Sequence, residues 1–499
     1  MTDSTRARAH PKRGTVALTA MGLSVGALLP FASPVAAQSV RGWVSTTIQV
    51  VQLRPLGLDT IPRGAVRQDD RGTFFFGDRP VVCVVSDLCT AYAPRPEVGS
   101  LAATQDLNLT AWGLGVRGLS FTTLLRGRAR LGSDLLWPRT DDEFDAILGY
   151  AQLVRGSWRV RAGRQELRSG LGFSAFDGGN ITLTRGDWRL EGYGGRSLAR
   201  GLREPANEAL RALDDFLPDD GVRLIGGSAQ TRFNETILTA RYQREVLADR
   251  SGLVSERASV DFSSVGHRAR VTGSLDYDFA FDQVGKGNLT VSVPLEGSRW
   301  LLEASGRRYV PYFEMSTIWG FFQPVSYTEA EVRSAWSSGS TFAAWVSGGW
   351  RRYQDTETSV ILQPLTDEGW RANAGLRWQA RDAWLLQGSY RLEWGPGGFL
   401  NSADVSARYH PSERLSVTAS GTTFQHIEEF RLGNGRAYGG GLSFDFGVTG
   451  RANLSGGMSM IRHRDEGTLV GSPWNQARGW TSLRIEVGND PGLAARRQP

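Results

Sequence analysis

The stretch that decides the fold runs from Glu368 to Gly395 and reads EGWRANAGLRWQARDAWLLQGSYRLEWG. In the two halves 370–380 and 384–394, the even-numbered positions carry apolar or small residues. Its odd-numbered positions are mostly polar and include Arg371, Arg377, Arg391 and Glu393. Period-two alternation over about ten residues, repeated on both sides of a tight turn, predicts a β-hairpin with one apolar face.

The length of these two strands points to a membrane rather than to a soluble sandwich, whose strands run about five or six residues. Trp370 and Trp378 lie on the apolar face, separated by roughly 26 Å at about 3.3 Å per residue. A tilt of about 40° reduces this span to about 20 Å, near the height of the apolar band between two aromatic girdles. The prediction is an all-β, transmembrane antiparallel β-barrel.

The N-terminus indicates export. Basic residues between Arg6 and Arg13 precede a mostly apolar run from Thr15 to Leu29, and Val35-Ala36-Ala37 fits a small-residue cleavage site. Residues 1–37 are therefore predicted to be a signal peptide; the alternative is a single membrane anchor. Together with the barrel pattern, this predicts a location in the bacterial outer membrane.

Composition excludes several function classes. The formal net charge of the chain is only +6, which is too modest to indicate a nucleic-acid partner. After residue 37 the basic residues are arginines with one exception, Lys286, a bias that codon usage in a GC-rich genome also produces. No glycine-rich phosphate loop, paired-cysteine metal motif or haem-attachment motif occurs, so no cofactor and no metal are expected.

Cys83 and Cys89 lie in the long segment 55–102, which is predicted to be an outer loop. An exported chain meets an oxidising environment, so a loop-stapling disulfide between the two is expected. The alternative, a metal site, lacks a nearby histidine.

From residue 38 to residue 487 the chain reads as strands joined alternately by short turns and longer links. The count is about 22 strands, within a range of 18–22, followed by a polar tail at 488–499. An even number returns the chain to the side on which it began. Residues 204–216 form a candidate amphipathic helix, either a pore constriction or a surface helix of the loop; both remain open.

The sharpest local signal is a strand crowded with charge between Trp158 and Gly195. A bulge at Gly163 would place both of its halves on the lumen side. Arginines converging on a narrow lumen form a positive constriction, whereas arginines matched by carboxylates form a ladder of ion pairs; both interpretations stay open. The residues concerned are Arg159, Arg161, Arg164, Glu166 and Arg168.

At this point the sequence resembles a family. The segments Gly163-Arg164-Gln165-Glu166-Leu167 and Phe176-Asp177-Gly178, with the strand from Trp188 to Gly195, resemble alginate-export-type outer-membrane porins. The resemblance covers residues 158–195 of 499. It implies a monomeric barrel that passes anionic polysaccharide or small anions, with Arg164 in the lumen and Asp177 as its partner or a loop anchor. The cysteine-bearing segment and the higher strand count depart from that family, which puts the polysaccharide in doubt more than the barrel.

Catalysis is not expected, because the histidines after residue 37 are scattered over separate predicted strands and turns, with no nucleophile placed beside them. The leading hypothesis is a porin for diffusion or export of small, anionic solutes through an arginine-lined pore, with outer-membrane lipid around it. The alternative is a non-conducting barrel that serves as a scaffold or receptor for a periplasmic or extracellular partner. The oligomeric state stays open.

Overall fold

The computed structural model describes residues 39–54, 56–69, 74–77, 79–83, 87–131, 144–198, 221–248, 252–295, 297, 299–310, 326–354, 367–395, 398–427, 435–465 and 473–489. The predicted signal peptide 1–37, the 204–216 loop and nearly all of the 488–499 tail lie outside these ranges.

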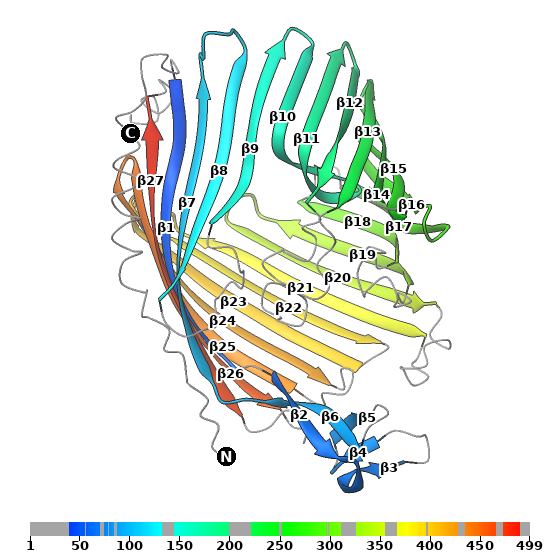
Figure 1. The fold of residues 1–499 in the computed structure, drawn as a ribbon, viewed down its shortest axis with the longest axis vertical. Coiled ribbons are helices and arrows are strands. Elements are labelled where there is room, and N and C mark those ends of the chain that lie inside the picture. The colour runs from blue at the N-terminus through cyan, green and yellow to red at the C-terminus, as the bar shows by residue number, and fades with distance from the viewer. Residues whose placement is uncertain are drawn as a thin grey trace, which may run out of the picture.

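Twenty-two antiparallel strands form one closed ring (Figure 1). Each strand pairs with the next along the chain, and the ring closes because β1 pairs with both β27 and β7. The strands are β1 (Ser39–Leu53), β7 (Val98–Trp112), β8 (Leu119–Arg130), β9 (Phe144–Arg155), β10 (Trp158–Ser169), β11 (Gly172–Arg185), β12 (Trp188–Ser197), β13 (Val222–Phe233), β14 (Thr236–Leu247), β15 (Leu253–Val265), β16 (Arg270–Asp278), β17 (Gln283–Pro294), β18 (Trp300–Tyr309), β19 (Tyr327–Ser337), β20 (Phe342–Tyr353), β21 (Glu368–Ala380), β22 (Trp384–Gly395), β23 (Gly398–Ser412), β24 (Leu415–Ile427), β25 (Gly435–Thr449), β26 (Ala452–Asp465) and β27 (Trp474–Gly488).

The predicted barrel and its count of 22 strands are confirmed. The hairpin that opened the sequence argument is β21–β22, and Trp370 lies opposite Trp394 in its register. Its turn places Arg381 at φ 62°, a left-handed conformation that closes a tight hairpin turn. Turns of this kind join the strands at one end of the barrel, which we take as the periplasmic end, and the longer links lie at the extracellular end.

The outer face of the ring carries the apolar halves of the strands. Val332 and Ile225 are 64% and 62% exposed, as side chains that face lipid are when no lipid is present. Four exposed tryptophans each begin a strand directly after a periplasmic turn and form an aromatic girdle at that membrane interface. They are Trp158, Trp188, Trp300 and Trp384. In a closed ring each strand pairs with a neighbour on both sides, as the bilayer interior requires. Together with the apolar exterior, this places the protein in the bacterial outer membrane.

The 55–102 segment is more than a loop. It contains a five-stranded sheet in the order β2-β6-β5-β4-β3, seen below the barrel in Figure 1. The predicted disulfide between Cys83 and Cys89 is present, and Cys89 packs with Ile61 and Val81 in a small core that alternation alone did not reveal. The elements are β2 (Leu56–Pro62), the 3-10 helix η1 (Arg63–Ala65), β3 (Arg67–Gln68), β4 (Phe74–Phe76), β5 (Arg79–Cys83) and β6 (Leu88–Pro94).

Among the described residues, no helix has the length and apolar character needed to cross a membrane.

Substitutions can test which side of each strand faces lipid and which side faces the lumen. Replacing Val332, at the centre of β19 on the lipid side, by arginine should lower the free energy of unfolding by about 2–4 kcal/mol, because the charge enters the hydrocarbon. The matched control is Ser305→Arg on the lumen side of the neighbouring strand β18, which should cost less than about 1 kcal/mol. Urea unfolding in lipid vesicles, followed by tryptophan fluorescence, measures both. Equal losses would contradict the assignment of the two faces.

Candidate functional site: an inward-folded hairpin in a charged lumen

The first half of β10 follows simple alternation. Trp158 and Val160 are exposed on the outer face, while the alternate residues Arg159 and Arg161 lie on the inner face. The Arg161 Nε donates to Gln152 Oε1 at 2.7 Å, and its guanidinium lies 5.3 Å from the centre of the Tyr150 ring. Arg161 is therefore held against the inner wall by neutral partners.

Three glycines on neighbouring strands lie in one row across the sheet. Gly163 of β10 pairs with Gly178 of β11, and Gly178 pairs with Gly195 of β12. A Cβ at any of the three would overlap a backbone carbonyl oxygen of the adjacent strand, and Gly163 also has φ +123°. Only glycine permits so close a backbone approach and such a bend. We call this row the glycine crease.

Beyond the glycine crease, the hairpin of β10 and β11 folds onto the inner face of the barrel. We call residues 164–177 the hairpin tip. Phe176 is fully buried and stacks on Tyr193 of β12, with ring centres 5.8 Å apart. Leu224 of β13 and Leu167 complete this apolar cluster. Fully buried apolar side chains inside a porin-like ring mark a second layer of structure, here the tip on the wall.

Polar contacts anchor the end of the hairpin tip to strands farther along the ring. The amide of Gln243 on β14 donates to Ser174 Oγ at 3.1 Å, and the Tyr193 hydroxyl donates to Gln243 Oε1 at 3.1 Å. Arg257 of β15 donates to the carbonyl of Leu171 in the turn. The tip therefore reaches β15, four strands beyond its own β11, and Figure 1 shows β10 and β11 curving in that direction.

Arg164 lies where β10 leaves β9. Pairing between these strands ends at Arg164 opposite Gly149, although both strands continue. The Arg164 guanidinium binds Asp177 through two hydrogen bonds of 2.7 and 2.8 Å, and its NH1 donates to the Ala146 carbonyl at 2.9 Å. The Asp145 Oδ1 atom lies 3.9 Å from Arg164 Nη1. Arg164 thus joins the two diverging strands, in place of a backbone ladder.

The bulge expected at Gly163 is absent, because β10 pairs with β11 without a register shift. The glycine crease bends both strands together instead. Of the other hairpin charges, Arg168 lies over the Phe173 ring at 5.6 Å, and Glu166 is half-buried opposite Ala175 in register. The structure therefore brings Arg164 and Asp177 together and leaves Glu166 and Arg168 outside that pair.

A second charged cluster lies on the inner face of β19–β22. Arg351 pairs with Glu329 and Glu393, and Arg371 pairs with Glu329 and Glu331. Arg391 pairs with Glu393, so three arginines meet three glutamates. Arg377 lies nearer the periplasmic end, opposite Gln387, outside this network.

Sequence reasoning missed three members of this network. Glu329, Glu331 and Arg351 occupy inward positions on β19 and β20, and Glu329 is only 3% exposed. Alternation around Val332 and Val346 assigns them to the lumen. Their pairing with Arg371 depends on the register between β19, β20 and β21, which a single sequence does not contain.

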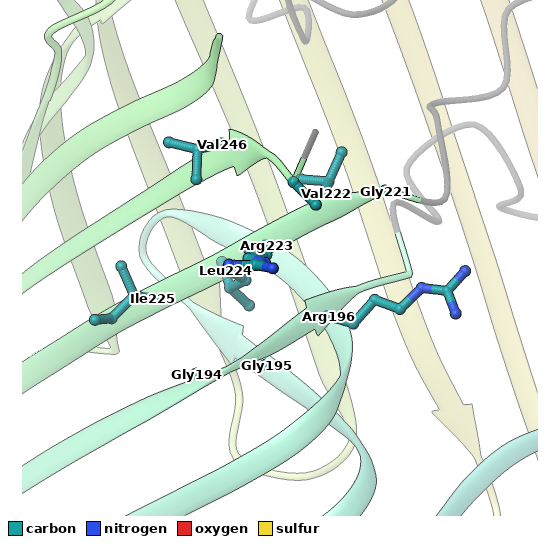
Figure 2. A pocket seen from close by; sticks show the side chains of 10 residues that line it. Gly194, Gly195, Arg196, Gly221, Val222, Arg223, Leu224, Ile225 and Val246 are labelled. Atoms are coloured by element: carbon teal, nitrogen blue, oxygen red, sulfur yellow. The ribbon is translucent and has the colours of Figure 1, made fainter. Parts of the chain in front are cut away.

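A mostly apolar hollow of about 800 Å³ adjoins the glycine crease at the extracellular ends of β12–β14. Its lining includes Gly194, Gly195, Ile225 and Val246, and Figure 2 shows Arg196 extending away from the apolar side chains. Glycines in place of side chains create this space, which offers little polar chemistry. Within the described part of the chain, no group of three His, Cys, Asp or Glu residues is placed to hold a metal ion.

The glycine crease predicts a difference between two adjacent glycines. Gly178→Ala should cost about 1–3 kcal/mol of unfolding free energy, because the new Cβ overlaps the Gly194 carbonyl and must part the strands. Gly179→Ala is the control, because its Cβ would meet nothing closer than Arg161 O at 3.8 Å. Neither glycine has positive φ, so the comparison isolates the close approach. Urea unfolding measures both variants, and equal stability would refute the crease.

Comparisons with known proteins agree with the fold. No protein-family model matches the chain, and no curated protein matches its sequence. Among solved structures, the ferric enterobactin receptor PfeA of Pseudomonas aeruginosa aligns with TM-score 0.50 and 10% identity, over 89% of this chain and 80% of that one. The siderophore receptor PirA of the same species gives 0.47 at 9% identity, over 91% and 81%. A BenF-like porin from Pseudomonas fluorescens Pf-5 gives 0.41 at 8%, over 91% and 100%. At such identities, the likeness to PfeA establishes a barrel fold of this kind and nothing finer.

Proposed function

We propose that this barrel is an outer-membrane channel that passes small anionic solutes. The observation that carries the proposal is a set of arginines on the lumen wall that lie outside the ion pairs of the structure. Within the described residues, arginines pair with the glutamates of the β19–β22 network and with Asp177 on the hairpin tip. Arg159, Arg161 and Arg377 lie on the inner face and have no carboxylate partner in that part of the chain.

Unmatched arginines set the sign of the potential inside the pore. A narrow, low-dielectric lumen focuses the field of its fixed charges and raises the local concentration of counter-ions. Rings of arginine select anions by this effect in other pores. The charges of the arginines and glutamates in the β19–β22 network cancel, so this network contributes little net field. The preference for anions therefore depends on the arginines that have no carboxylate partner.

The hairpin tip supplies the constriction. It occupies lumen space beside β12–β15 and is anchored through Phe176, Ser174 and Leu171. A solute that crosses the barrel passes this layer, and Arg168 on the tip is exposed. In this proposal the tip sets the pore width and the unmatched arginines set the preference for anions.

As part of the same proposal, we infer that this chain is related to the alginate-export-type porins. The two short motifs that carry the resemblance oppose each other in register, with Gly163 opposite Gly178, Arg164 opposite Asp177, and Gln165 opposite Phe176. The six residues form one structural unit at the glycine crease, which gives a physical reason for their joint occurrence. Polysaccharide export is the finer form of the hypothesis; we assign no catalytic role.

Conductance across a planar bilayer tests the proposed function. Under a KCl gradient, the reversal potential should have the sign of an anion-preferring pore. The double variant Arg159→Gln/Arg161→Gln should move it toward zero by removing two unmatched charges. Arg381→Gln, at an exposed periplasmic turn, removes the same kind of charge away from the lumen and should leave the potential unchanged. Absence of conductance, or a cation preference in the unaltered protein, would overturn the proposal.

A receptor role is the second candidate, and the sheet β2–β6 at the extracellular end favours it. This sheet has its own core and disulfide, so it is rigid enough to present a binding surface. Replacing residues 56–94 by a short flexible linker should leave channel conductance intact under the channel proposal. If conductance is absent in both proteins and a co-purifying partner is lost with the sheet, the receptor hypothesis is supported instead.

A further inference from the structure

One pair of cations in the lumen shares a single aromatic ring. Lys286 Nζ of β17 lies 5.6 Å from the centre of the Tyr309 ring, and the Arg307 guanidinium of β18 lies 5.1 Å from the same centre. Arg307 also lies 5.6 Å from the ring of Tyr327 on β19. Lys286 opposes Tyr309 directly in register, and both cations are exposed.

Neither cation has a carboxylate partner within the described residues. Asp276 of β16 accepts a hydrogen bond from the backbone N of Lys286 at 2.7 Å, and Asp276 and Asp278 both line the same small hollow as Lys286. The other carboxylate oxygen of Asp276 lies 3.8 Å from Arg257 NH1. Asp276 is therefore engaged by two donors, and within the described residues neither Asp276 nor Asp278 forms an ion pair with the Lys286 ammonium.

The two cations repel each other, and the tyrosine rings relieve this only in part. A ring quadrupole attracts a cation but carries no net charge. Arg307 lies opposite Glu329 in the β18–β19 register, but the carboxylate of Glu329 is bound by Arg351 and Arg371. An anion within reach of both cations would gain from both charges at once.

We propose that Lys286, Arg307 and Tyr309 form an oxyanion-binding site on the lumen wall. The inference rests on the proposed anion channel and names the chemistry of its solute. An arginine fork binds two oxygens of a carboxylate or phosphate, and a lysine ammonium adds a compact charge. The site therefore prefers an anion with several oxygens over chloride.

The position of the site gives it a place on the route through the lumen. Arg257 binds both the Leu171 carbonyl in the hairpin tip and Asp276, and Asp276 holds the backbone of Lys286. The site is therefore adjacent to the anchored end of the constriction. An oxyanion bound there would lie beside the hairpin tip.

Calorimetric titration of the folded, detergent-solubilised full-length barrel tests the site without requiring conductance. Inorganic phosphate is the first probe, acetate the second and chloride the reference. Phosphate and acetate should both bind more tightly than chloride. The double variant Lys286→Gln/Arg307→Gln should weaken phosphate binding by about tenfold or more, because two charge-assisted contacts are lost. Tyr309→Phe keeps the ring and should bind as the unaltered protein does.

Arg381→Gln is the matched control, because it removes one arginine outside the lumen and should leave phosphate affinity unchanged. Each single variant, Lys286→Gln and Arg307→Gln, should weaken binding, which keeps the test available if the double variant fails to fold. Unchanged phosphate affinity in folded variants overturns this site and leaves the anion channel standing. A cation-preferring reversal potential in the unaltered protein overturns the channel, while phosphate titration still reports on the site.

Discussion

The whole structure depends on hydrogen-bonded pairing of the backbone, because the hydrocarbon interior of the membrane offers no other hydrogen-bond partners. Each strand of the ring is paired on both edges, and β1 closes it against β27 and β7. The ladder breaks at the point where β10 leaves β9. There Arg164 donates to the Ala146 carbonyl of β9 and binds Asp177 of β11, so its side chain links the strands where their backbone pairing has ended.

Because β10 leaves the wall and folds inward, the barrel has a second layer of structure on its inner face. The glycine crease makes the turn possible, and the buried contact of Phe176 with Tyr193 and Leu224 stabilises it. The ring thus supplies the membrane-spanning wall, and the hairpin tip packs on its inner face. Arg351, Arg371 and Arg391 pair with glutamates on the inner face of β19–β22. Arg159, Arg161 and Arg377 lie on the inner face outside that network.

Much of the fold was readable from the sequence, because alternation in a barrel strand reflects lipid on one side and lumen on the other. The β21–β22 hairpin, the number of strands and the cysteine pair follow from local pattern. The small sheet β2–β6 did not, because its strands are short and its core rests on a few contacts within an irregular segment.

The candidate site was readable only in part. Gly163 broke the alternation, which pointed to an irregularity, but its alignment with Gly178 and Gly195 is a property of register. Lys286 stood out as the one lysine after residue 37, yet its significance depends on Arg307 lying over the same ring. Spacing along the sequence does not show which residues of different strands lie side by side.

The central claim is that the hairpin tip lies inside the lumen and narrows the channel. Single-channel conductance of a folded variant in which residues 165–176 are replaced by a two-residue turn tests it most directly. The account predicts a larger conductance than that of the unaltered protein, with anion preference retained because Arg159, Arg161 and Arg377 remain. An unchanged or smaller conductance would contradict it.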